Sequence, residues 1–147
     1  MLNNLLSPDV IQRISSVKDW REAIAISCQP LINNGAIEPR YVDAICRSHE
    51  ELGPYYVVGS GIAMPHARPE EGANRLALSL TVISKGVPFG SEGNDPIKLL
   101  IVLAATDSSS HIGAIAKLAE LFDSQQDINR LIQASTQKEI LLVIQHY

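Results

Sequence analysis

The chain has 147 residues, 46% of them hydrophobic, and a formal net charge of −4, and this length is enough to bury the core of one domain. Its 12 lysines and arginines form no basic cluster, which argues against binding to nucleic acid. The first residues lack a charged segment followed by an apolar one, and no apolar run approaches the roughly 20 residues that cross a bilayer. We therefore expect a cytoplasmic protein with no direct membrane insertion.

The first third of the chain predicts a short strand and two helices. Residues 10–14 are rich in β-branched side chains, which is typical of a strand. Asp19 is a suitable N-cap for a helix, and the Asn-Asn-Gly sequence at residues 33–35 is a stop signal for it. A second helix fits residues 39–52, because it would begin with a proline and a Gly-Pro pair follows it.

The two cysteines, Cys28 and Cys46, each fall inside one of these predicted helices. Two cysteines in helical segments do not form the framework of a disulfide-rich secreted protein. Free cysteine is usually buried in folded proteins. We therefore expect two buried free thiols.

The middle of the chain predicts four strands. Residues 55–58 and 62–64 are separated by Gly-Ser-Gly, which indicates a hairpin-like or bulged connection, and residues 77–84 alternate as a strand does. Residues 86–96 contain three glycines and two prolines, which is typical of a surface loop. Residues 97–105 are nearly all apolar; their length permits a buried helix, but the isoleucines, valines and flanking loops favour a central strand covered on both faces.

The last third predicts helices. A Ser-rich turn supplies N-caps for a helix over residues 111–122, and two shorter helices fit residues 127–134 and 136–146, with Thr136 and Glu139 as a capping box. The inward stripe of the first helix is predicted at Ile112, Ile115, Ala116, Leu118, Ala119 and Phe122. Helices interleaved with strands predict an α/β fold, a mixed β-sheet flanked by helices on both faces, in a single domain over residues 1–147.

The sequence Met64-Pro65-His66 places an imidazole at the margin of this predicted sheet. Proline has no N–H and a fixed φ, so it belongs at a strand end, and loops beyond strand ends are where ligands bind in α/β sheets. A lone histidine is more often a structural or surface residue. Here, however, glycines on both sides allow close backbone approach, Arg68 lies two residues away, and His111 stands at the start of a predicted helix.

Together these groups suit phosphoryl transfer through a histidine. A neutral imidazole keeps one nitrogen free as a nucleophile at cellular pH. An arginine and a helix N-terminus attract a dianionic phosphoryl group. Because this transfer depends on positioning and charge stabilisation, the arrangement demands no metal and no cofactor, and we predict none.

Three other kinds of site fit less well. Asp107 and the serines at 108–110 with two histidines suggest a serine hydrolase, but no G-x-S-x-G elbow is present. The histidines and cysteines lack the H-x-x-x-H or C-x-x-C spacing of a zinc site. Glu70 and Glu71 could be acid/base carboxylates, but their surroundings are typical of a turn with solvated charges.

The motif GIAMPHARPEEGA, with the later DSSSHIGAIAKLAELF, resembles the IIA component of the bacterial phosphoenolpyruvate-dependent sugar phosphotransferase system, in the mannitol/fructose/ascorbate superfamily. The resemblance covers nearly the whole chain and implies one type-2 EIIA domain with the mixed sheet predicted above. The segments GPYY and PHARPE are closest to the ascorbate and cryptic-mannitol branch. By this resemblance His66 matches the phosphorylated histidine and His111 its active-site partner.

The resemblance also implies a phosphotransferase mechanism and partners. His66 would accept a phosphoryl group from the phosphocarrier protein HPr and pass it to a cysteine of the cognate IIB component. IIB would hand it to ascorbate or a mannitol-like sugar moving through the membrane IIC component. The alternative is a regulatory IIA-like module, whose phosphorylation controls a binding partner instead of feeding transport.

The chain departs from the mannitol and fructose members at one position. Where those proteins commonly carry an arginine on the helix before the active histidine, this chain has Glu50. The work of that arginine must then be done by another cation or not at all. Arg68 is the first candidate and Arg47 the second.

Overall fold

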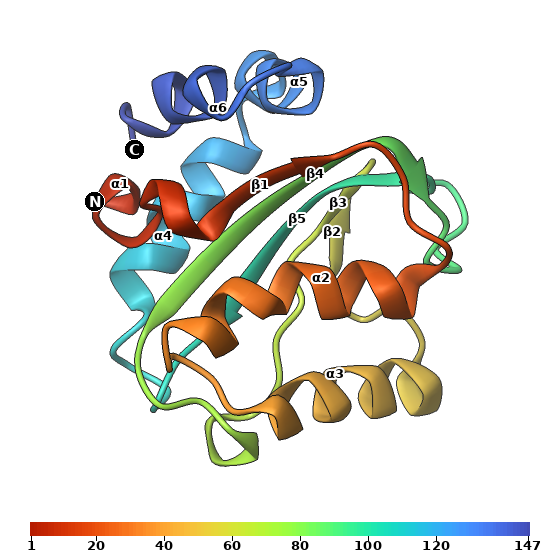
Figure 1. Ribbon diagram of the computed structural model, residues 1–147, viewed down its shortest axis with the longest axis vertical. Coiled ribbons are helices and arrows are strands. Elements are labelled where there is room, and N and C mark those ends of the chain that lie inside the picture. Colours follow the sequence, from red (N-terminus) through yellow and green to blue (C-terminus); the bar gives the residue numbers. More distant parts are fainter.

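Five strands form one mixed sheet in the computed structural model, which describes residues 1–147 (Figure 1). Their order across the sheet is β1 (Ile11–Ile14), β4 (Ala77–Val87), β5 (Ile97–Ala104), β3 (Ile62–Ala63) and β2 (Val57–Gly59). β1 runs parallel to β4, and β3 runs parallel to β5, whereas the β4–β5 and β2–β3 pairs are antiparallel. The two central strands are almost entirely buried, as predicted for strands covered on both faces.

Helices cover both faces of the sheet, which confirms the predicted fold class. One face carries α2 (Trp20–Asn33) and α3 (Pro39–Leu52); the other carries α1 (Leu2–Leu5), α4 (Ile112–Phe122), α5 (Gln125–Gln133) and α6 (Gln137–Ile144) (Figure 1). Neighbouring residues of β1 reach opposite layers: the Gln12 amide donates to the Ile26 carbonyl of α2 at 2.7 Å, and the Arg13 guanidinium donates to the Ala134 carbonyl, just after α5, at 2.6 Å. This alternation is the period of a strand. None of the helices combines the length and apolar character that a membrane crossing requires.

Helices α2 and α3 begin and end where their sequence signals predict. The Asp19 carboxylate accepts the N–H of Glu22 at 2.9 Å and so caps α2. α3 has the predicted bounds, and Gly53 ends it with φ of 82°, a conformation that glycine adopts without strain.

The C-terminal helices differ from the prediction by a few residues. α5 begins at Gln125 rather than 127, because the Ser124 hydroxyl supplies its cap. Thr136 caps α6 by accepting the N–H of Glu139 at 3.2 Å. The Glu139 carboxylate accepts from Ser135 instead of closing the box on Thr136, so only half of the predicted capping box forms.

The prediction of a surface loop at residues 86–96 is partly wrong. β4 continues to Val87, and the Val87 and Phe89 side chains are only 2% and 1% exposed. The Asp95 carboxylate accepts three successive backbone N–H groups, from Phe89 to Ser91, at 2.9 to 3.0 Å. These hydrogen bonds fold the glycine-rich segment back, which puts the Phe89 ring into the core.

The predicted inward stripe of α4 is partly wrong: Leu118 is buried and Phe122 packs against the core, as predicted, but Ile112, Ile115, Ala116 and Ala119 are exposed. Ala114, Leu118 and Leu121 are the buried positions of this helix, a spacing of four and then three residues that faces the sheet. Ile112 is 63% exposed and Ile115 37% exposed. α4 therefore presents apolar side chains to solvent near its first turn.

An aromatic cluster lies between α2, α3 and the end of β4. The Trp20 ring stacks on the His49 ring with centroids 3.7 Å apart, and the Tyr56 hydroxyl lies 2.6 Å from His49 Nδ1. The Phe89 ring is tilted against the Trp20 and His49 rings, with centroids 6.5 and 6.1 Å away. Burial lowers the pKa of His49 below its ordinary value of 6.5, so the imidazole is kept neutral.

The two cysteines differ in burial. Cys28 is fully buried, as predicted. Cys46 is partly exposed, so the prediction is wrong for this cysteine. Burial raises the pKa of both thiols. Neither cysteine is oxidised to a disulfide.

Candidate functional site

His66 lies where the carboxyl ends of two parallel strands meet. β3 ends at Ala63 and pairs in parallel with β5, so the segments that leave both strands emerge at one edge of the sheet. The Leu103 N–H donates to the Pro65 carbonyl at 3.0 Å and extends this pairing up to the histidine. The chain leaving β5 enters the turn before α4, so parallel pairing brings His111 to the same edge.

The His66 ring is half-buried and held by its own backbone neighbours. Its Nδ1 lies 2.8 Å from the Met64 carbonyl, and because a carbonyl can only accept, Nδ1 carries the proton. The Tyr55 hydroxyl donates to the His66 carbonyl, and the two rings meet edge to face at 5.5 Å. The lone pair of Nε2 is therefore the free nucleophile.

His66 and His111 line one hollow of about 340 Å³, which we call the α4-side hollow. Its other lining residues are Tyr41, Ala67, Pro69, Leu103, Ala105, Asp107 and Ser108. His111 is the N-cap residue of α4, but its side chain makes no capping hydrogen bond, and its buried Nδ1 has no partner. The structure thus brings together the two histidines that the sequence singled out.

Arg68 lines a second hollow of about 360 Å³, which shares His66 and Ala67 with the first and which we call the α3-side hollow. This hollow is lined by Arg47, Ser48, Glu51, Leu52, Tyr55, His66, Ala67, Arg68 and Glu71. Glu71 lies between the two arginines: one carboxylate oxygen is 3.4 Å from the Arg47 guanidinium, and the other accepts the Arg68 N–H at 3.4 Å. The guanidinium of Arg68 forms none of the five ion pairs of the molecule.

Glu50 lines neither hollow. Its carboxylate pairs with Arg21 of α2, whose guanidinium lies 4.4 Å from the centre of the Trp20 ring. Arg47, three residues earlier on α3, does line the α3-side hollow together with His66. Of these two positions on α3, only position 47 brings a charge to the hollow, and that charge is positive.

Tyr41 is a residue of the site that the sequence did not reveal as one. Its hydroxyl donates to the Leu103 carbonyl at 2.8 Å and accepts the Ala67 N–H at 3.0 Å. Burial raises its pKa to about 12, so it stays a neutral donor. This one hydroxyl joins the loop that carries His66 to the end of β5, and no local pattern marks it, because both partners are backbone groups distant in sequence.

Asp107 holds the turn before α4 and does not complete a catalytic triad. Its Oδ1 accepts the N–H groups of Ser109 and Ser110 at 2.9 and 2.6 Å and the Ser109 hydroxyl at 3.2 Å. These hydrogen bonds lower the pKa of its carboxyl to about 2. Since His111 Nδ1 has no partner, the histidine–aspartate bond that a serine hydrolase needs is absent.

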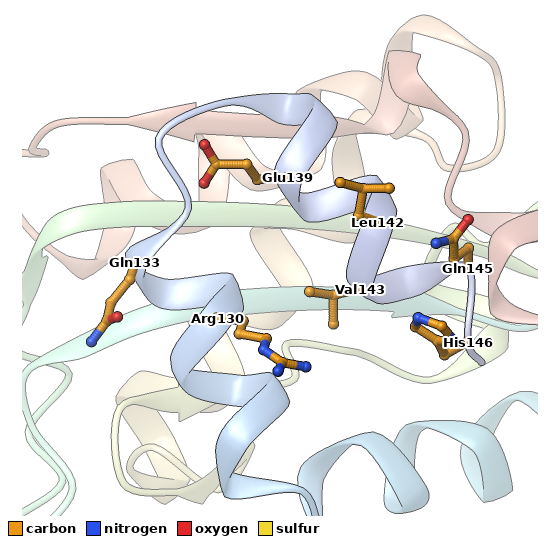
Figure 2. A pocket seen from close by; sticks show the side chains of 7 residues that line it. All are labelled: Arg130, Gln133, Glu139, Leu142, Val143, Gln145 and His146. Carbon is orange, nitrogen blue, oxygen red and sulfur yellow. The ribbon is translucent and has the colours of Figure 1, made fainter.

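A larger hollow, of about 500 Å³, lies at α5 and α6 (Figure 2). Figure 2 shows the Arg130 guanidinium and the His146 ring on either side of Val143. Arg130 is already paired with Asp127 at 3.1 Å, and this hollow shares no residue with those around His66. It offers no nucleophile beside a free cation, so we do not place the chemistry there.

Solved structures share this fold over nearly its whole length. The solution structure of the mannitol-specific cryptic phosphotransferase enzyme IIA from Escherichia coli is 44% identical, with a TM-score of 0.91 over 99% of each chain. The mannitol enzyme IIA of Escherichia coli, solved in complex with phosphorylated enzyme IIB, is 28% identical, with a TM-score of 0.82 over 97% of this chain and 100% of that one. Fold and site together define a domain of the enzyme IIA class.

Sequence comparisons agree with this class. The mannitol-specific cryptic IIA component of Escherichia coli is 44% identical over 97% of both chains, and the ascorbate-specific EIIA component of the same species is 37% identical over 88% of this chain and 85% of that one. Residues 4–147 match the family described as "Phosphoenolpyruvate-dependent sugar phosphotransferase system, EIIA 2". The chain belongs to this family, whose members are phosphotransfer carriers.

Proposed function

We propose that the protein takes a phosphoryl group from the phosphocarrier protein HPr on His66 and passes it to a cysteine of a cognate IIB component. The observation that carries this proposal is the His66 ring, fixed at the sheet margin with Nε2 free and beside the ring of His111. IIB would then phosphorylate a sugar entering through the membrane IIC component. This relay places the protein in the cytoplasm.

The first transfer needs no proton exchange at His66. The Nε2 lone pair attacks phosphorus, a new N–P bond forms, and the N–P bond to the histidine of HPr breaks with its electron pair returning to that ring. The His66 ring becomes positively charged, and its Nδ1–H keeps donating to the Met64 carbonyl. In the second transfer the thiolate of IIB attacks phosphorus, and the N–P electron pair returns to Nε2.

Three side chains are suited to stabilise the phosphoryl oxygens. Arg68 and Arg47 approach His66 from the α3-side hollow and His111 from the α4-side hollow. A loose phosphoryl transition state spreads its charge over three oxygens, so donors on two sides are useful. Arg68 remains the first candidate, because its guanidinium is not held by a carboxylate.

Exposed apolar side chains flank the site on both sides. Leu52 and Tyr55 border the α3-side hollow, and Ile112 and Ile115 project from the first turn of α4. A protein partner that covers these side chains would exclude water from the phosphoryl group during transfer. This arrangement favours transfer between two proteins over transfer to a free small molecule.

The sugar we propose is ascorbate or a mannitol-like compound, on the basis of the names of the relatives. The second candidate function is a regulatory IIA-like module. Both use the same phosphorylated histidine, so only the acceptor separates them.

The test is a reconstituted relay of phosphoenolpyruvate, enzyme I, HPr and the purified protein. We expect an acid-labile label on His66 that IIB discharges, no label on His66→Ala, and full labelling of His146→Ala, which lies far along the chain in another hollow. A labelled His66→Ala variant would show that the site is wrong. A label that no cognate IIB accepts would favour the regulatory module.

A further inference from the structure

The α4-side hollow contains one charged side chain besides its two histidines, and that charge is negative. The residue is Asp107; neither Arg47 nor Arg68 lines this side of His66. Asp107 takes part in none of the five ion pairs of the molecule. A carboxylate without a counter-ion therefore lines the hollow that contains both histidines.

The position of this carboxylate is fixed. Two backbone N–H groups and the Ser109 hydroxyl all donate to its Oδ1, and these bonds keep it ionised at cellular pH. It does not orient the His111 ring, because His111 Nδ1 has no partner. The hydrogen bonds explain the shape of the turn, but they do not require a charge, since an amide oxygen accepts the same bonds.

We propose that Asp107 sets the phosphoryl-transfer potential of His66: its carboxylate repels the dianionic phosphoryl group and so favours discharge to the acceptor. This inference rests on the proposed phosphorylation of His66. The N–P bond still forms and breaks as described above, and Asp107 makes or breaks no bond. It acts on the energy of the phosphorylated protein alone.

The expected size of this effect follows from Coulomb's law. A phosphoryl group carries −1.5 to −2 charges, and the cube root of the hollow's volume is about 7 Å. In water-like surroundings one carboxylate at that separation changes an equilibrium by about twofold after screening by salt. An effect of this size is small beside chemistry, but it shifts the balance between two carriers that hold the group about equally well.

The experiment measures the equilibrium partition of the phosphoryl group between HPr and this protein, by ³¹P nuclear magnetic resonance at fixed total phosphate. Asp107→Asn keeps the accepting oxygen and removes the charge. Asp123→Asn removes the same charge at the other end of α4, at the exposed C-cap. Because the partition is an equilibrium, it does not depend on how tightly HPr docks. Asp107→Ser, with a short hydroxyl acceptor, serves if the Asn variant is unstable.

We expect Asp107→Asn to shift the partition about twofold toward phosphorylated His66, and Asp123→Asn to leave it unchanged. Raising the salt to about 1 M, where the Debye length is about 3 Å, should shrink the difference between Asp107→Asn and the unaltered protein. If Asp107→Asn and the unaltered protein show the same partition, or if Asp107→Asn shifts the partition toward HPr, this inference is overturned and the proposed function stands. An unaltered protein that takes no phosphoryl group from HPr overturns both.

Discussion

The two hollows that share His66 have nearly the same volume, about 360 Å³ toward α3 and about 340 Å³ toward α4, but they differ in charge. The α3 side offers Arg47 and Arg68, with Glu71 bound to the first. The α4 side offers His111 and the unpaired Asp107. The α3 side also holds Glu51 and Glu71, so the two sides differ in having cations or none. A carrier must both receive and release the same group, and arginines in one hollow with a lone carboxylate in the other suit both needs. Size alone would not have distinguished the two sides.

The largest effect is expected on the α3 side. Replacing Arg47 and Arg68 together by alanine should slow transfer from phosphorylated HPr about 100-fold, because preorganised donors to a developing anion contribute on this scale. Rapid-quench kinetics measures the rate. Arg130→Ala, which removes an arginine at α5, is the matched control. An unchanged rate in the double variant would remove both arginines from the site, and the single variants rank the two.

A smaller effect is expected on the α4 side. His111→Ala removes one donor at the N-terminus of α4 and should slow transfer about tenfold with the fold intact. Circular dichroism verifies the fold, and the same rapid-quench assay gives the rate. If His111→Ala transfers as fast as the unaltered protein, the His111 side chain takes no part in the transfer.

A third change affects the junction of the two sides. Tyr41→Phe leaves the part-buried Ala67 N–H and the buried Leu103 carbonyl without their shared partner, which should lower the free energy of unfolding by about 1–2 kcal/mol. Tyr55→Phe removes a hydroxyl that donates to the His66 carbonyl near the surface. This change should lower the free energy of unfolding by less. Urea unfolding of the two variants compares them directly, and an equal loss would contradict the role of Tyr41 as the junction.

The smallest expected effect concerns the pH dependence of stability and involves His49 of α3. The pKa of His49 is lower in the folded protein than its ordinary value of 6.5, so the unfolded chain binds a proton first as the pH falls. Stability that is present above pH 6.5 is then lost progressively below it. Urea unfolding at pH 7.5 and 5.5 should show this loss, and His49→Gln should reduce it while the exposed His146→Gln does not. A pH dependence that His49→Gln leaves intact would assign it to other groups.

Much of this organisation could be predicted from the sequence, because its signals are local. Caps and breakers placed α2 and α3, and apolar runs placed the central strands. A motif marked His66 and a predicted helix start marked His111. The parallel pairing of β3 with β5 explains why the two histidines lie in one hollow. The orientation of α4 could not be read from its sequence: it has apolar residues on several sides, and only packing against the sheet decides that Ala114 and Leu118 face inward.

The features that were missed depend on contacts distant in sequence. α1 is only four residues long, too short to show a helical period, and it is held because the Tyr147 carbonyl accepts the Leu2 N–H at 2.9 Å. The Tyr41 hydroxyl bridges two backbone groups. The burial of Phe89 depends on Asp95 collecting N–H groups across a glycine-rich loop.

The stack of Trp20 on His49 gives this protein a built-in optical reporter. Trp20 is the only tryptophan, so all indole emission comes from one ring in contact with α3. A carrier that docks over Arg47 and tilts that helix would change the emission without any added dye. Stopped-flow fluorescence could then time each encounter separately from the chemistry that follows it.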